Sequence, residues 1–466
     1  MNKAARKSIT LLMAAAMSGC ALIKPDYKRP EVELPASWNQ SAQNPARHGG
    51  WWSIYSDPAL EKLVAEALEH NTDLARAVAR VDQTRALLVQ TDAALYPQVD
   101  ASFTRNRTLS SADTGLLPPG APREQNNYQA AVSVSYEIDL WGKLRASSQA
   151  ARADLLASEA AQETVRIALA ADVAKTWFAL RALDAEVVST RRAVTFLEEG
   201  LALQKKRFEH GVISEFDYRQ LEAEAAARRG QLPPLERDRE VIEAGLAVLL
   251  GRSPRSIMED SIAREAEDTS KAQVPAVVPE GLPSELLLRR PDLIEAEQRL
   301  IAANARIAVA RAAMFPSIPL TGYAGSEATT LAALFSGPAA VWQIAIGAVG
   351  TIFAAGRLEA QVDESRARER ELLAAYQGAI QNAFREVRSA LVTQKRARES
   401  YDIESGRVVA LEATLRLVRL RYRNGLASQL EVLDAERNLL DALNSRHEAL
   451  RAQRAAVADL FKALGG

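Results

Sequence analysis

The sequence predicts an α+β membrane protein that is built from two tandem copies of one unit. Three observations indicate this class. Short motifs recur at a nearly constant spacing, each copy contains one long helical run without proline, and each copy carries segments in which apolar and polar residues alternate.

Residues 1–19 are predicted to be a lipoprotein signal peptide. Lys3, Arg6 and Lys7 precede an apolar run that is too short to span a bilayer as a helix. The run ends at Cys20, the only cysteine in the chain, which follows small residues as in a bacterial lipobox. Cys20 is therefore the expected lipidation site, and outer-membrane lipid is its expected partner. The alternative is an ordinary signal peptide with an unrelated cysteine.

Neither the charge of the mature chain nor its motifs indicate nucleic-acid binding or catalysis. Removing residues 1–19 takes away three positive and no negative charges, so the formal net charge moves from -1 to about -4, a balance that argues against a nucleic-acid partner. The four histidines are scattered, and the chain has no HExxH pair, P-loop or serine elbow. We therefore expect no catalytic residue, no metal ligand and no cofactor.

An internal repeat organises the mature chain. The spacing between matching motifs is about 219 residues in the early part of each copy and 214 residues later. This predicts a first repeat at 61–251, a proline-rich linker at 252–283 and a second repeat at 284–466. The matched positions are Asp73 and Asp292, Pro97 and Pro316, Gly142 and Gly356, Arg207 and Arg421, and Gly211 and Gly425.

Very long helices dominate each copy. The runs 142–211 and 356–425 lack proline and are rich in Ala, Leu, Glu and Arg, and each would be roughly 100 Å long as a helix. Apolar residues recur at three- and four-residue spacing, which is typical of a coiled-coil seam. Shorter helices are expected at about 61–95 and 214–250, stacked end to end beside the long one. Pro233-Pro234 must kink or break the second of them.

Between these helices the hydrophobic period changes to two. Strands are predicted at about 98–108, 127–140, 317–326 and 340–353. Each hairpin has one apolar face and one more polar face, and the second hairpin's other face is less polar than that of the first. A bilayer tolerates no unpaired strand edge, and the smallest membrane barrels use about eight strands. Four strands therefore cannot close a barrel alone, whereas a trimer would supply twelve. The alternative is a pair of soluble hairpins that pack on the helices.

Three motifs carry a family resemblance. Tyr-Glu-Ile-Asp-Leu-Trp-Gly-Lys at 136–143, Arg-Arg-Pro-Asp-Leu at 289–293 and Phe-Pro-Ser at 315–317 resemble the NodT-type lipoprotein branch of the TolC/OprM-like outer membrane factors. The resemblance implies a homotrimer with a twelve-stranded outer-membrane β-barrel, four strands per chain, continuous with a twelve-helix periplasmic α-barrel. It also implies a mixed equatorial region to which residues 20–60 and the linker 252–283 contribute.

The same resemblance implies a function and partners. The chain would be the lipid-anchored outer-membrane duct of a tripartite efflux system, conducting passively and catalysing nothing. A periplasmic adaptor and an inner-membrane pump of the resistance-nodulation-division type would be its partners and would choose the substrate. The alternatives are a conduit for type I protein secretion and a periplasmic coiled-coil scaffold lipoprotein.

Each long helix is expected to end in a tight hairpin turn. Gly211 and Gly425 suit a left-handed helix cap, and Ser214 and Ser428 follow as N-caps of the next helices. The resemblance places these turns at the periplasmic end, where the adaptor docks.

The resemblance also implies a gate beside these turns. Acidic residues repeated by threefold symmetry would form a negative constriction that favours cations, and a neighbouring arginine or tyrosine would latch the closed state. For Glu431 the alternative is a capping box with Ser428, in which the glutamate satisfies its own helix start. The expected gate residues are Glu431, Asp434, Asp217, Arg421 and Tyr422.

Overall fold

The computed structural model describes residues 27–30, 50–111, 113, 120, 122–264 and 290–466. The predicted signal peptide, Cys20 and the linker residues 265–283 lie outside the described residues. In the part of the chain that is described, no helix combines the length and the hydropathy needed to cross a membrane.

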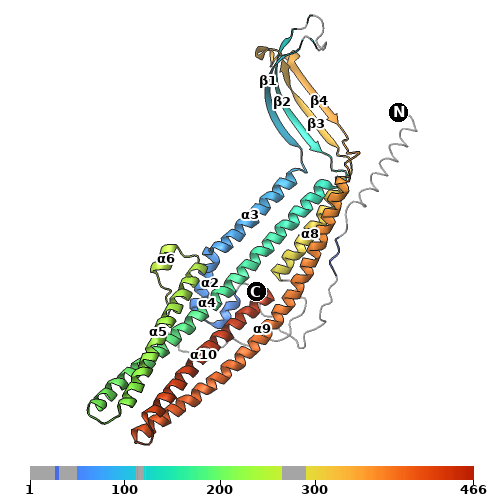
Figure 1. Ribbon diagram of the computed structural model, residues 1–466. Helices are drawn as coiled ribbons and strands as arrows, with labels where there is room; N and C mark the ends of the chain where they lie inside the picture. Colours follow the sequence, from blue (N-terminus) through green and yellow to red (C-terminus); the bar gives the residue numbers. More distant parts are fainter. Residues whose placement is uncertain (1–26, 31–49, 112, 114–119, 121, 265–289) are drawn as a thin grey trace. The chain divides into compact units, whose positions relative to one another are not determined.

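The described elements are long helices and one four-stranded sheet (Figure 1). In chain order they are η1 (Trp51–Tyr55), α2 (Pro58–His70), α3 (Thr72–Ala93), β1 (Gln98–Leu109), β2 (Glu124–Glu137), α4 (Lys143–Glu209), α5 (Glu215–Leu249), α6 (Pro254–Glu259), α8 (Pro291–Ala312), β3 (Pro319–Ala328), η3 (Leu331–Ala333), η4 (Gly337–Ala339), β4 (Ala340–Ile346), α9 (Arg357–Arg423) and α10 (Gln429–Leu464).

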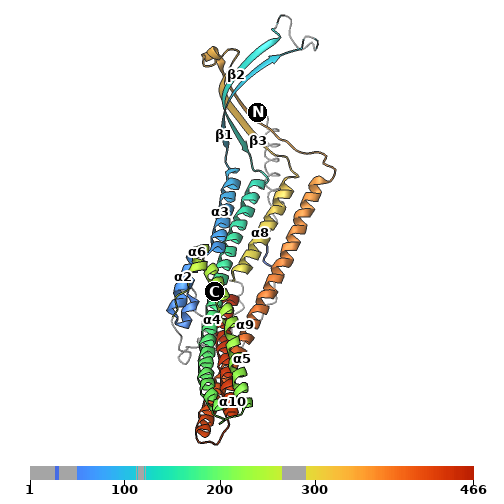
Figure 2. The same ribbon diagram turned by 60° about the vertical axis from the view of Figure 1, so that its left-hand side comes forward.

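The chain divides into two compact units. The sheet unit contains residues 27–30, 80–159 and 295–377, and the hairpin unit contains the remaining described residues. The long helices α4 and α9 contribute residues to both units. Figure 2 shows the same elements from a second direction.

The sheet is antiparallel, in the order β1-β2-β3-β4. Residues directly opposite one another in such a ladder share a face. Val99 lies opposite Val134, and Val132 lies opposite Ala324, which in turn lies opposite Trp342. The alternating residues of all four strands therefore form one continuous apolar face, and the intervening residues form a more polar one.

The strand predicted at 340–353 is too long. β4 ends at Ile346, and beyond it only one isolated bridge joins Val349 to Ser317. The neighbouring segment of the same chain, which leads into β3, explains the early end, because Pro316 and Pro319 carry no N–H group to extend a regular ladder.

The single helix predicted at 61–95 is also wrong. Asn71 ends α2 with an extended backbone, and its Oδ1 accepts hydrogen bonds from the N–H groups of Asp73 (2.9 Å) and Leu74 (3.0 Å), which start α3. Its Nδ2 donates to the carbonyl oxygen of Leu249, the last residue of α5, at 2.9 Å. This buried asparagine therefore joins the C-terminal end of α5 to the break between α2 and α3.

The second repeat contains a comparable joint at Arg290, which immediately precedes α8. Arg290 Nη1 donates to the carbonyl oxygen of Ala463 near the end of α10 at 2.7 Å. Its guanidinium also forms ion pairs with Asp292 and Glu386, both at 2.8 Å. In both repeats, then, a buried polar side chain binds a carbonyl group at the C-terminal end of the shorter helix.

Pro233 and Pro234 do not break α5, which continues from Glu215 to Leu249. A proline inside a helix removes one main-chain hydrogen bond and crowds the carbonyl group four residues earlier. Both prolines are exposed, as are Arg229 and Gly230 at those earlier positions. Water can therefore reach the carbonyl groups that lose their partners.

Two sequence motifs meet where the sheet joins the helices. The ring of Trp141 stacks on Phe315 with centroids 4.8 Å apart, and Trp141 Nε1 donates to the carbonyl oxygen of Pro316 at 2.7 Å. The carboxylate of Asp139 accepts hydrogen bonds from the N–H groups of Leu144 and Arg145, both at 3.1 Å. Asp139 thus caps α4 and fixes the point at which β2 passes into the long helix.

The hairpin unit has an aromatic core. The rings of Trp51 and Phe461 stack at 5.3 Å, and Tyr55 contacts Phe178 edge-on at 4.6 Å. Trp177 is buried beside them, and its Nε1 donates to Asp57, the N-cap of α2, at 2.7 Å. This core holds η1 and α2 against the middle of α4 and the end of α10.

Candidate functional site

The two helical hairpin turns have the same backbone conformation. Gly211 and Gly425 adopt left-handed φ values of 70° and 73°. In the first turn Val212 N donates to the carbonyl oxygen of Arg207 at 2.8 Å, and in the second Leu426 N donates to that of Arg421 at 2.8 Å. Each turn is therefore a Schellman motif, which satisfies the carbonyl groups at the end of the long helix.

Serine caps the helix that leaves each turn. Ser214 Oγ accepts a hydrogen bond from Asp217 N at 3.1 Å, and Ser428 Oγ accepts one from Glu431 N at 3.2 Å. The expected N-cap roles of both serines are confirmed.

Glu431 completes a capping box. Ser428 N donates to Glu431 Oε1 at 2.9 Å, so the carboxylate satisfies the start of its own helix. This backbone hydrogen bond lowers the pKa of Glu431, because it stabilises the ionised form. Arg421 Nη1 lies 3.9 Å from the other carboxylate oxygen. The local explanation of Glu431 is therefore confirmed, and the carboxylate stays charged and exposed at the turn.

The carboxylate of Asp434 is paired with side chains of its own helix, α10. Its carboxylate forms an ion pair with Arg437 and accepts a hydrogen bond from Asn438 Nδ2 at 3.2 Å. Sequence reasoning missed these two partners, although their spacing of three and four residues places them beside Asp434 on any helix.

Tyr422 links the two hairpins. Its hydroxyl oxygen accepts hydrogen bonds from Gln204 Nε2 at 3.3 Å and Arg207 Nη1 at 3.4 Å, both on α4. A small apolar cluster supports this contact, because Leu433 on α10 packs against Leu197 of α4 and Leu221 of α5. Neither partner of Tyr422 was expected from the sequence.

The structure does not bring all the expected gate residues together. Asp217 contacts Ser214, whose hydroxyl donates to its carboxylate at 2.8 Å. Among the contacts of the described residues, none joins Asp217 to Glu431 or Asp434. Within those residues there is also no group of three His, Cys, Asp or Glu side chains placed to hold a metal ion. A single chain therefore presents separate exposed carboxylates beside the two turns.

Comparison with known proteins identifies a family. A family model described as "Outer membrane efflux protein" matches residues 63–252 and 282–466. A probable efflux pump outer membrane protein, TtgC of Pseudomonas putida KT2440, is 35% identical over 471 residues that cover 99% of this chain and 96% of the relative. The cation efflux system protein CusC of Escherichia coli O6:H1 is 30% identical over 470 residues, covering 99% and 98%.

Solved structures show the same fold. The Campylobacter jejuni CmeC outer membrane channel superposes with a TM-score of 0.88 at 26% identity, covering 95% of this chain and 94% of that one. The open state of the Neisseria gonorrhoeae MtrE outer membrane channel gives a TM-score of 0.81 at 32% identity, with 95% and 98% covered.

We expect Gly425→Val to loosen the second turn, because a left-handed backbone costs a side chain with a Cβ about 1–2 kcal/mol. A Cβ at this position meets no atom within 4 Å, so the backbone angle alone causes the strain. Trypsin should cut after Arg421 or Arg423 faster than in the parent. Gly425→Asn is the matched control, since asparagine tolerates this conformation. Equal cleavage rates for the valine and asparagine variants would contradict the prediction.

Proposed function

The chain belongs to the outer membrane efflux protein family, and we propose that three copies of it form the exit channel of a tripartite efflux system. The chain is an outer-membrane channel component of such a system and is not an enzyme. Its relatives are efflux proteins, which sets aside both the secretion conduit and the coiled-coil scaffold. The trimer is proposed because the four-stranded sheet has two outer edges that lack a strand partner among the described residues.

The sheet leaves one side of β1 and one side of β4 without a strand partner among the described residues. In lipid no water satisfies such edges, so membrane strands occur in closed barrels. Trp342 and Ile344 on the apolar face are 76% and 73% exposed in the single chain, which suits a lipid-facing surface. Three chains close a barrel of twelve strands, and their long helices continue it as a twelve-helix tunnel.

The proposal extends to the organisation of the chain. The matching turns at Gly211 and Gly425 and the matching joints at Asn71 and Arg290 support an internal tandem duplication. The described parts of the segments 20–60 and 252–283, at residues 27–30, 50–60 and 252–264, are the proposed contribution to the mixed equatorial region of the assembly.

The hairpin turns are the proposed contact with a periplasmic adaptor. Apolar side chains follow both glycines directly, and Val212 and Leu426 are 68% and 67% exposed. Each turn satisfies its own backbone hydrogen bonds and still exposes an apolar side chain. This arrangement is more typical of a surface that binds another protein than of a solvated loop. The adaptor in turn couples the channel to an inner-membrane pump of the resistance-nodulation-division type, which supplies energy and selects the substrate.

Glu431 and Asp434 form the proposed selectivity ring. Three copies of each carboxylate around a narrow axis would concentrate negative potential where ions must pass. Arg437 and Arg421 offset part of this charge within each chain, and Asp217 adds acidity at the first turn. Release of the contacts between Tyr422 and α4 is the proposed opening step, since they hold the two hairpins together.

Lipidation of Cys20 is the proposed anchor of the channel in the outer membrane. We expect the mature N-terminal peptide to begin at Cys20 and to carry acyl chains, whereas Cys20→Ser should leave the signal peptide uncleaved at this position. Mass spectrometry of the N-terminal peptide measures both. An unmodified Cys20 on the mature wild-type chain contradicts the assignment.

Asp434→Asn should reduce the cation preference of the channel in planar bilayers, because it removes three charges from the proposed ring. Glu431→Gln should act in the same direction while keeping the capping box, which accepts glutamine as well as glutamate. The measurement is the reversal potential in a salt gradient.

The matched control is Asp82→Asn, which breaks an equally spaced ion pair with Arg85 in the sheet unit. It should leave the reversal potential unchanged. If Asp434→Asn selects ions like the parent channel, the acidic ring is not at this position. If no preparation conducts at all, the channel function itself fails.

A further inference from the structure

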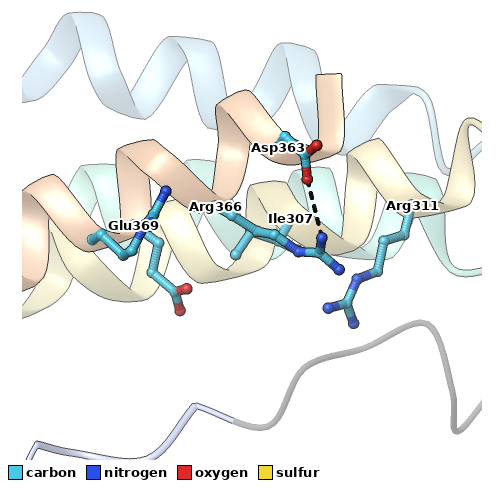
Figure 3. Close-up of a pocket in the computed structure, with 6 residues that line it drawn as sticks. Ile307, Arg311, Asp363, Arg366 and Glu369 are labelled. Atoms are coloured by element: carbon cyan, nitrogen blue, oxygen red, sulfur yellow. Dashed lines mark hydrogen bonds and ion pairs between the residues drawn. The ribbon is translucent and has the colours of Figure 1, made fainter. Parts of the chain in front are cut away.

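A basic groove lies between α8 and α9 in the sheet unit (Figure 3). It has a volume of about 640 Å³. Arg311 is in the last turn of α8, a few residues before β3 begins, so the groove lies near the base of the sheet. The lining residues are Ile307, Arg311, Asp363, Arg366, Glu369 and Arg370.

The positive charges in this groove exceed the negative ones. Of its two carboxylates, Asp363 accepts a hydrogen bond from Arg366 Nη1 at 3.1 Å, and Glu369 accepts one from Asn304 Nδ2 at 2.8 Å. The guanidinium groups of Arg311 and Arg370 form no hydrogen bond or ion pair with another described residue. The groove therefore holds two guanidinium groups that are available to a ligand.

The geometry suits a phosphate group. Figure 3 shows Arg311 and Arg366 reaching toward the same space from different helices. Side chains tilt toward the N-terminus of their own helix. Because α8 runs toward the sheet and α9 runs away from it, the two sets of arginines converge. Guanidinium forks bind phosphate oxygens in pairs, and Ile307 gives the groove an apolar wall.

The chain's own N-terminal segment binds α8 farther from the sheet, beyond the residues that line the groove. Arg29 Nε donates to Glu297 Oε1 at 2.8 Å, and the Tyr27 hydroxyl donates to the same oxygen at 3.3 Å. Glu297 precedes Arg311 by fourteen residues of α8, about 21 Å along the helix. Cys20 precedes Tyr27 by seven residues, which reach at most about 24 Å. A lipid anchor at Cys20 therefore allows the membrane surface to lie beside the basic groove.

We propose that Arg311, Arg366 and Arg370 bind the phosphate of an anionic phospholipid from the leaflet that faces the periplasm. This inference rests on the proposed barrel, which sets the sheet in the membrane. The competing explanation is a solvated patch, in which Arg311 merely complements the negative end of the α8 dipole. That explanation gives no role to Arg370, which lies inside α9 away from its C-terminal end, and leaves Arg366 only its ion pair with Asp363.

Thermal unfolding of the purified full-length protein in a neutral detergent tests the site. A ligand that binds only the folded state raises Tm, and the rise grows with the ratio of its free concentration to its Kd. Short-chain phosphatidylglycerol should raise Tm, whereas short-chain phosphatidylcholine and inorganic phosphate at the same concentration should not. The Arg311→Gln, Arg370→Gln double variant should lose the phosphatidylglycerol effect, and Arg370→Lys, which keeps the charge but not the fork, should keep part of it.

Arg368→Gln is the matched control. Arg368 is on the same helix but is paired with Glu371 at 2.6 Å and lies outside the groove lining. It should respond to phosphatidylglycerol like the parent. An undiminished response in the double variant overturns the proposal, and so does an equal response to inorganic phosphate, which would indicate a site for a free anion.

Conductance separates this inference from the proposed channel. If the double variant conducts in planar bilayers but its Tm does not rise with phosphatidylglycerol, the result supports the lipid site within a working channel. Parent protein that conducts yet shows no response to phosphatidylglycerol overturns the lipid site alone. Parent protein that neither conducts nor forms trimers overturns the channel on which the site rests.

Discussion

The rest of this architecture depends on the need to pair the two outer edges of a four-stranded sheet. The register places apolar residues on one face across all four strands, yet β1 and β4 each have one side without a strand partner among the described residues, which leaves a row of main-chain donors and acceptors open. Lipid cannot satisfy these groups, so in the proposed assembly the four described strands share their edges with those of other copies. In that proposed assembly the long helices continue the barrel as a closed helical tunnel.

Where the chain changes direction, local hydrogen bonds satisfy the backbone groups at the helix ends. Side chains at the tips are therefore not needed for this purpose. At Gly425 the Schellman hydrogen bonds complete α9, and at Ser428 the capping box completes α10. Buried polar side chains do the same at the joints, where Asn71 and Arg290 bind carbonyl groups near the ends of α5 and α10. The hairpin tips can therefore expose acidic and apolar groups without weakening the helices that present them.

Sequence patterns predicted the features that arise from short-range physics. Alternation at Val132 and Val134 indicated the strands because one face must avoid water, and glycine and serine indicated the turns because their preferences are local. The division of the first helix at Asn71 was missed, although this asparagine caps α3 locally through Asp73 and Leu74. The bond from its side chain to Leu249 could not be predicted, because the two residues are distant in sequence. The basic groove was missed for the same reason, because only packing of α8 against α9 brings Arg311 near Arg366.

Disulfide trapping across the sheet edges tests the trimer most directly. Ser102→Cys on β1 would be combined with cysteine at Val341, Gln343 or Ala345 on the same face of β4 and oxidised in isolated membranes. Ser102→Cys with Ala131→Cys, which lie opposite each other in one chain, is the intrachain control. The account predicts covalent products that reach three chains and stop there. Products confined to one chain, or a ladder extending beyond three, would contradict it.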